Sequence, residues 1–148
     1  MRDIEAIYAA LFAKGQAVNS AQTPLTTQSR RWIAWDQMAA EQSPAFFQRE
    51  PKFNVSGGER GLSRFVFRAE WYLYLATDPS DLGTVTATPI NNYATAFINA
   101  LLPSLQGQKQ TLGGLVENAY IDGEVLIDEG VISSPAILFI PITILTGL

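Results

Sequence analysis

The chain has 148 residues, of which 47% are hydrophobic and 16% charged, and its formal net charge is −4. A chain of this length fits one domain, and it is too apolar for intrinsic disorder. It contains no cysteine and no histidine, which excludes disulfides, thiol nucleophiles, zinc-finger ligands and every Ser–His or Cys–His catalytic pair. The acidic balance also argues against general nucleic-acid binding, which needs a basic surface.

The chain opens with a predicted amphipathic helix over residues 2–18. Its apolar residues recur at the spacing of one helical face: Ile4, Ile7, Tyr8, Leu11 and Phe12. The N-terminus does not resemble a signal peptide, because Arg2 is followed by Asp3 and Glu5. The apolar run 136–145 is about half as long as a membrane helix needs to be. We therefore expect the chain to fold in the cytosol and to have no membrane partner.

Two short strands are predicted next, over residues 31–35 and 45–49. Both segments are rich in aromatic residues, and the Ser43-Pro44 pair marks a break between them. Residues 51–62 contain Gly57, Gly58 and Gly61 and show no hydrophobic period. They are interpreted as a long mobile loop between two strands.

Residues 63–77 show the clearest strand pattern in the chain. Alternate positions carry a continuous apolar row, which predicts the core-facing side of the strand: Phe65, Phe67, Ala69, Trp71, Leu73 and Leu75. The other parity is mixed: Val66, Arg68, Glu70, Tyr72 and Tyr74.

A second helix is predicted to begin at Thr88, with Thr88 as N-cap and Pro89 at the first helical position. Its apolar stripe ends at Pro103. Weak alternation over 115–125 predicts a strand, an acidic turn follows at 128–130, and the apolar run 136–145 predicts a last strand. Pro141 lies inside this run, which indicates an edge position or a bulge.

This order predicts an α+β domain spanning residues 1–148, with a mostly antiparallel five-stranded sheet. The elements follow as one helix, three strands, one helix and two strands, and the two helices are expected to pack on one face of the sheet. The other face should be polar in a monomer, yet both parities of the last strand are apolar. Two readings remain open: the 51–62 loop or the N-terminal region covers this face, or it forms a subunit interface.

Several segments of the chain together are typical of a known protein family. The stretch 109–125 reads KQTLGGLVENAYIDGEV, and it is followed by the acidic residues at 128–129 and the run 136–145. Together with the opening helix and the segments 71–75 and 88–92, it resembles the tail-terminator proteins of long-tailed bacteriophages, a group that includes lambda-type minor tail protein U. The likeness follows the same element order over nearly the whole chain, although none of these motifs is catalytic.

The resemblance implies a non-enzymatic α/β subunit without cofactor or metal. Such subunits form a homohexameric ring that caps the tail tube, stops its polymerisation and provides the surface for head attachment. Its partners would be further copies of the chain, the major tail tube protein and a head–tail connector or neck protein, and genome DNA would pass through the ring without specific binding. The expected location is the tail or neck of the virion, after assembly in the host cytoplasm. Another neck or tail-completion protein is the alternative. The free sheet face supplies the candidate contact residues: Val66, Tyr72, Tyr74, Ile137, Phe139 and Leu145.

The acidic residues Asp122, Glu124, Asp128 and Glu129 admit three interpretations. They form a solvated hairpin turn, or they face the channel of a ring and repel DNA phosphates, or they hold a hard cation. A metal hydrolase would use Asp122, Glu124 and Asp128 together with Asp36. Their spacing fits no EF-hand loop, and the solvated turn is favoured.

Two further groups are weighed against ordinary structural roles. The glycine-rich segment 57–61 lacks the Gly-Lys-Ser/Thr ending of a phosphate-binding loop. Arg30, Arg31, Arg49 and Lys52 are interleaved with aromatic residues that could stack on single-stranded bases. The negative net charge favours strand and edge roles for these four side chains.

Overall fold

The computed structural model describes residues 3–20, 23–57, 61, 63–130 and 134–147. Over these residues the chain forms two α-helices, two 3-10 turns and six strands. In chain order these are α1 (Ile4–Gln16), β1 (Thr27–Ser29), η1 (Trp35–Gln37), η2 (Ala40–Gln42), β2 (Ala45–Gly57), β3 (Ser63–Leu75), α2 (Ala87–Leu101), β4 (Asn118–Ile121), β5 (Leu126–Asp128) and β6 (Ala136–Gly147). None of the helices in the described ranges is long and apolar enough to cross a bilayer.

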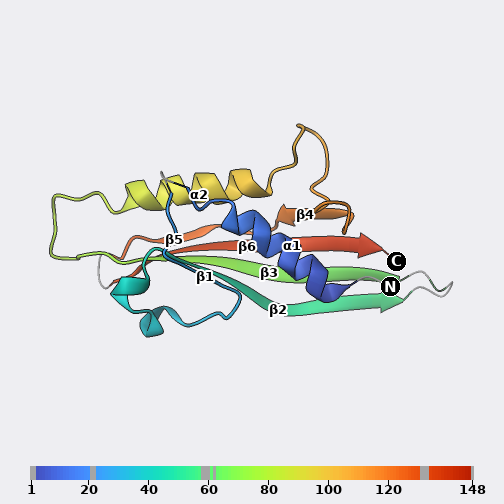
Figure 1. The fold of residues 1–148 in the computed structure, drawn as a ribbon, viewed down its shortest axis with the longest axis horizontal. Helices are drawn as coiled ribbons and strands as arrows, with labels where there is room; N and C mark the ends of the chain where they lie inside the picture. The colour runs from blue at the N-terminus through green and yellow to red at the C-terminus, as the bar shows by residue number, and fades with distance from the viewer. Residues whose placement is uncertain (1–2, 21–22, 58–60, 62, 131–133, 148) are drawn as a thin grey trace.

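The strands form one sheet in the order β1-β2-β3-β6-β4, and β5 also pairs with β6 (Figure 1). Only the β1–β2 pair is parallel. The predicted α+β class with two helices and a mostly antiparallel sheet is confirmed, with six strands in place of five.

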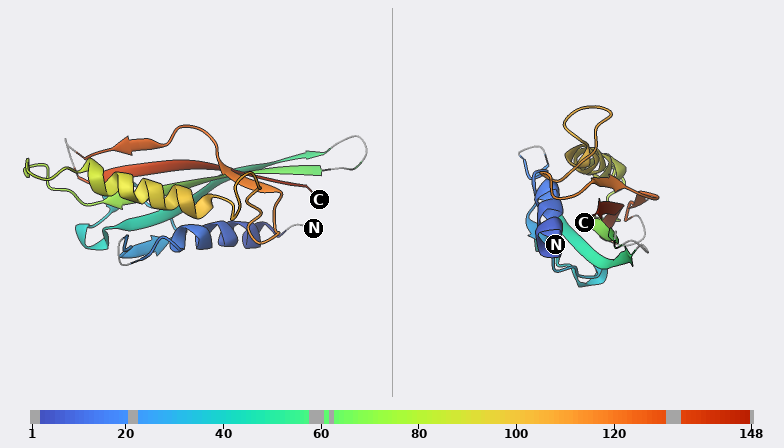
Figure 2. Two further views of the ribbon diagram at one scale, coloured as in Figure 1. Left: turned by 90° about the horizontal axis from the view of Figure 1, so that it is seen from above. Right: turned by 90° about the vertical axis from the view of Figure 1, so that its right-hand side faces the viewer.

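Both helices pack on the same face of the sheet (Figure 2). Asp3 accepts a hydrogen bond from the Ala6 amide and so caps α1. In the core, the Phe46 ring lies 5.0 Å from Phe97 of α2 and 5.5 Å from Trp71 of β3, measured between centroids. The predicted core row of β3 is confirmed, because Phe67, Ala69, Trp71 and Leu73 are at most 1% exposed.

The predicted strand at 31–35 is wrong. The strand forms earlier, at β1, and residues 32–34 have no regular structure. Trp32, Ile33 and Met38 instead pack onto a small cluster on the sheet face opposite the helices. Their apolar character therefore reflects packing over the sheet, not pairing within it.

The predicted loop at 51–62 is also wrong for residues 51–57. They continue β2, which forms a long hairpin with β3, and Phe53, Val55 and Gly57 pair with Phe67, Phe65 and Ser63. A register shift between Arg49 and Lys52 accommodates Pro51. Residues 58–60 and 62 lie outside the described residues.

Two predicted helix and strand boundaries also shift. Helix α2 begins at Ala87, so Pro89 stands at its third position, and Thr86 is the N-cap residue without a side-chain cap. The expected strand at 115–125 shortens to β4. Helix α1 agrees with its prediction to within two residues at each end.

Pro141 stands opposite a bulge, although β6 is an interior strand at that point. Strands β4 and β5 both run antiparallel to β6 along the same edge, so residues 122–125 stand opposite only Ile140 and Pro141. The Pro141 carbonyl accepts a hydrogen bond from the Asp122 amide. Because the N and O atoms of one strand residue point to the same side, the missing N–H of Pro141 faces this bulge and leaves the β3 pairing intact.

Candidate interaction surface

The six candidate contact residues lie on one face of the sheet, opposite the helices, which we call the far face. They form three cross-strand pairs between β3 and β6: Val66 with Leu145, Tyr72 with Phe139, and Tyr74 with Ile137. The Tyr72 and Phe139 rings lie 5.2 Å apart between centroids. The strand period thus brings together the residues that the sequence selects.

Tyr74 is covered by the chain itself. It is 1% exposed beneath the segment that joins β1 to β2, and its hydroxyl donates a 2.8 Å hydrogen bond to the Ile33 carbonyl. This burial raises the pKa of Tyr74 to about 12. Tyr74 and Phe47 therefore belong to a second small core and are not available to a partner.

Next to this covered end lies an apolar groove of about 400 Å³, which we call the far-face groove. Its lining residues are Glu70, Tyr72, Leu126, Ile127, Asp128, Ile137 and Phe139. Leu126 and Ile127 remain 52% and 44% exposed. The groove therefore combines an apolar floor with one carboxylate at each side, Glu70 and Asp128.

Ion pairs occupy the middle of the far face. Arg68 lies 2.8 Å from Asp122, and Thr143 donates a 2.9 Å hydrogen bond to the same carboxylate. The hydrogen bonds from Arg68 and Thr143 lower the pKa of Asp122. Beside it, Arg49 pairs with Glu70 at 3.2 Å and stacks over the Trp32 ring, 5.0 Å from its centroid. These charged side chains neutralise one another.

The four acidic residues do not share one turn, because β4 and β5 lie end to end along β6. Asp122 and Glu124 lie between β4 and β5, whereas Asp128 and Glu129 lie where β5 leads into its antiparallel partner β6. Ile121 pairs with Ile142 and Asp128 with Ile137, which places Asp122 and Asp128 roughly 15 Å apart. Asp128 accepts a hydrogen bond from the Gly130 amide, and Glu124 and Glu129 are exposed. In the described ranges, Asp36 included, no three acidic residues are close enough to hold a metal ion.

No protein-family model and no curated protein matches this chain. The function is therefore inferred from the surfaces of the molecule.

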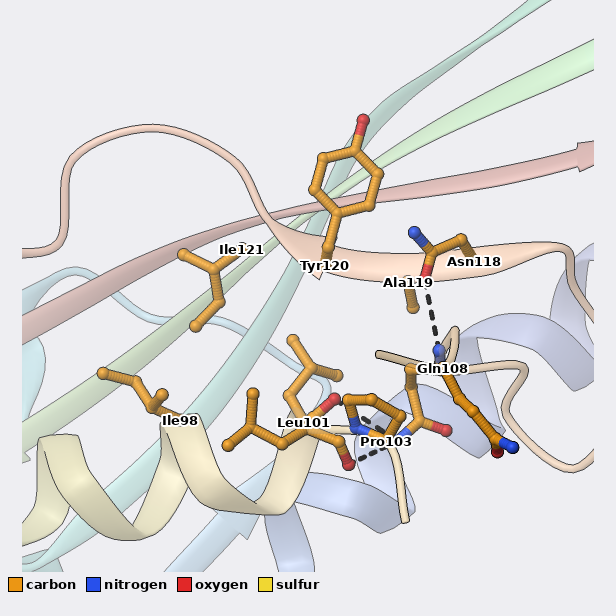
Figure 3. Close-up of a pocket in the computed structure, with 10 residues that line it drawn as sticks. Ile98, Leu101, Pro103, Gln108, Asn118, Ala119, Tyr120 and Ile121 are labelled. Atoms are coloured by element: carbon orange, nitrogen blue, oxygen red, sulfur yellow. Dashed lines mark hydrogen bonds between the residues drawn. The ribbon is translucent and has the colours of Figure 1, made fainter. Parts of the chain in front are cut away.

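A second apolar pocket, of about 320 Å³, separates the end of α2 from β4. Ile98 and Leu101 of the helix face Ile121 of the strand, while the Tyr120 ring points away from α2 (Figure 3). The buried Gln110 amide at the pocket donates to the carbonyls of Leu101 and Leu102 and so caps the helix. None of the residues that line this pocket is charged.

Some of the basic side chains near the aromatic residues of β1 and β2 form ion pairs, and others do not. Arg30 donates to Glu50 at 2.7 Å and also pairs with Glu5, whose pKa its hydrogen bonds and charge lower. Arg49 is held by Glu70 and Trp32. Lys52 and the exposed Arg64 of the hairpin have no side-chain ion pair among the described residues.

The hairpin carries contact candidates that the sequence interpretation missed. Phe53 is 43% exposed and Val55 is 54% exposed, both on the helix-side parity of β2. Their signal was the continued alternation of apolar residues after Pro51. The turn-like composition of 51–62 concealed it.

Proposed function

We propose that the chain is a structural subunit of a phage tail. It forms a ring at the end of the tail tube, stops tube polymerisation and offers a surface for attachment of the head or neck. The ring would consist of copies of this chain, and the resemblance implies six.

The observation that carries the proposal is the far-face groove. Its exposed Leu126 pairs with Phe139 and lies near Tyr72, whereas Ile127 pairs with the core residue Leu138 and borders the groove from the helix-side parity. Burying a large apolar side chain contributes about 1.5–3 kcal/mol, so a partner that covers this groove gains from several of them at once. Exposed apolar patches of this kind commonly mark interaction sites. The likeness to tail terminators, in the same element order, supports a ring as the assembly.

The paired charges and dispersed carboxylates favour an assembly role over hydrolysis. Asp122 is engaged by Arg68 and Thr143, and it stands well away from Asp128 along the sheet edge. A metal hydrolase would need these side chains to converge. Repulsion of DNA in a ring channel would fall mainly to Glu124 and Glu129, which are exposed and form no ion pair within the described part of the chain.

The test is imaging of the purified protein mixed with polymerised tail tubes. We expect six-fold rings at one end of each tube and no further tube growth. In a phage that lacks the gene, tails should have abnormal lengths. Tails of normal length that stay unattached to heads would contradict the terminator role and favour a neck protein.

A further inference from the structure

The hairpin of β2 and β3 projects beyond both helices (Figure 2). Tyr8 of α1 packs on Phe67 of β3, with ring centroids 5.6 Å apart, and so covers β3 at that position. Phe53 and Val55 follow further out on the same face and are about half exposed. Strand β6 flanks β3 out to Gly147 and Arg64, so the described part of the hairpin belongs to a sheet whose apolar helix-side face is left uncovered at Phe53 and Val55.

Strand β5, which lines the far-face groove, lies toward the opposite end of the sheet (Figure 1). Val55 pairs with Phe65, whereas the groove contains Tyr72 of the same strand. Seven residues of extended strand separate these positions by roughly 24 Å. Because strands β2, β3 and β6 hold the hairpin rigidly in the sheet, it cannot fold back into the groove of its own molecule.

The charges of the two ends are complementary. Lysine and arginine are absent from residues 71–108 and 110–148, so the groove end carries only acidic charge from these segments, including Asp78, Asp81, Asp128 and Glu129. The hairpin carries Lys52 and Arg64 on the face opposite Phe53 and Val55. Lys52 lies on β2 beyond the residues that pair with β1, and Arg64 lies beside Gly147, the last described residue of β6. Both long side chains therefore stand near a border of the sheet and can reach around it to a flanking carboxylate.

We propose that the hairpin of one copy docks in the far-face groove of a second copy. Phe53 and Val55 cover the apolar floor beside Leu126 and Phe139, and Lys52 and Arg64 lie near Asp128 and Glu129. Such a contact is head-to-tail, and repeated head-to-tail contacts close into a ring when the rotation between copies allows it. The inference specifies the contact within the proposed ring and rests on that function for its biological setting.

Two substitutions at exposed positions test it, one on each half of the contact. Phe53→Asp removes the hairpin half and Leu126→Asp removes the groove half, and Leu105→Asp serves as the matched control at a 61% exposed leucine outside both. Sedimentation velocity over a range of concentrations measures assembly of the full chain. Circular dichroism confirms that each variant is folded, and Val55→Asp replaces Phe53→Asp if the latter unfolds.

We expect the wild type and Leu105→Asp to assemble with increasing concentration, and each interface variant to remain monomeric. An equimolar mixture of Phe53→Asp and Leu126→Asp should form one-to-one dimers, because it retains one intact hairpin and one intact groove. Assembly by either variant alone, a mixture that stays monomeric, or a wild type that is monomeric at every concentration would overturn the contact. Tail length in the deletion phage tests the proposed function separately. A terminator whose rings survive Phe53→Asp would refute this contact alone.

Discussion

At Gly15, the backbone of helix α1 lies directly against the Phe46 ring of the sheet. A Cβ atom at this position would lie 2.3 Å from the Phe46 ring, which is fully buried and contacts Phe12, Trp71 and Phe97. The glycine therefore serves packing, although it stands only one residue before the end of α1. Its lack of a side chain sets the depth at which α1 lies on β2.

We expect Gly15→Ala to destabilise the protein by about 1–2 kcal/mol. Overpacking costs about 1–3 kcal/mol, which outweighs the gain of roughly 1 kcal/mol in helix propensity. Urea unfolding measures the change. Adding Phe46→Leu, which removes the clashing ring edge, should recover part of the loss and reveal coupling between the two sites. A more stable Gly15→Ala protein would show that α1 lies further from the sheet.

Asp122 predicts a specific dependence of stability on pH. Arg68 and Thr143 lower its pKa in the folded protein below the usual 3.8. Its contribution to stability is therefore fully present above the unfolded value, near pH 4, and is lost as the pH falls through the lower folded value. Asp122→Asn should reduce the melting temperature at pH 7 and make the loss of stability in acid less steep. Glu124→Gln, which removes a carboxylate without such partners, is the control. A melting difference between Asp122→Asn and wild type that stays constant from pH 7 to pH 2.5 would contradict the assignment.

At the scale of elements, the bulge between β4 and β5 shapes one side of the far face. The pairing register against β6 changes by two residues between β4 and β5, at the place where Pro141 offers no N–H. The bulge ends next to Leu126, which lines the far-face groove. Gly123 lies in the bulge with φ of +120°, and a Cβ there would come within 3.3 Å of the Pro141 ring. Only glycine adopts this conformation without strain.

We predict that Gly123→Ala lowers stability by about 1–3 kcal/mol, the usual cost of a strained backbone residue. Gly83→Ala is the control, because its φ is ordinary and a Cβ there meets only the Asp81 carboxylate at 3.4 Å. Chemical denaturation of the two variants side by side gives the comparison. Equal midpoints would mean that the bulge relaxes to accept a side chain.

The elements also show how far the sequence alone could predict this molecule. Helical spacing in α1 and α2 and strict alternation in β3 located those elements, because one buried face imposes its period on the sequence. A strand was wrongly predicted at 31–35 because apolar residues that pack on top of a sheet show the same sequence pattern as residues within a strand. Pro51 concealed the outer half of β2, since a register shift that admits a proline has no signal of its own. The far face was predicted as a surface, whereas the cover over Tyr74 and the groove depend on how segments distant in sequence meet.

At the scale of the whole molecule, charge is distributed unevenly along the sheet. The hairpin end carries Lys52 and Arg64, which form no ion pair with any residue that the structure describes, and the long segments without lysine or arginine supply the acidic opposite end. A molecule with a net charge of −4 would repel copies of itself if the charges were spread evenly. This separation instead favours approach of unlike ends, and it orients two copies before their apolar surfaces meet.

Salt should therefore weaken self-association. The screening length falls from about 10 Å at 0.1 M ionic strength to about 3 Å at 1 M, while apolar burial remains. We expect the concentration at half-assembly to rise roughly three- to tenfold over this range, the size of two exposed ion pairs. The double variant Lys52→Glu/Arg64→Glu should assemble weakly at low salt and lose this dependence or reverse it, because its ends then carry like charge. Sedimentation at several salt concentrations measures both proteins. Tighter wild-type assembly at high salt would show that apolar contact alone drives association and that the charges of the two ends do not meet.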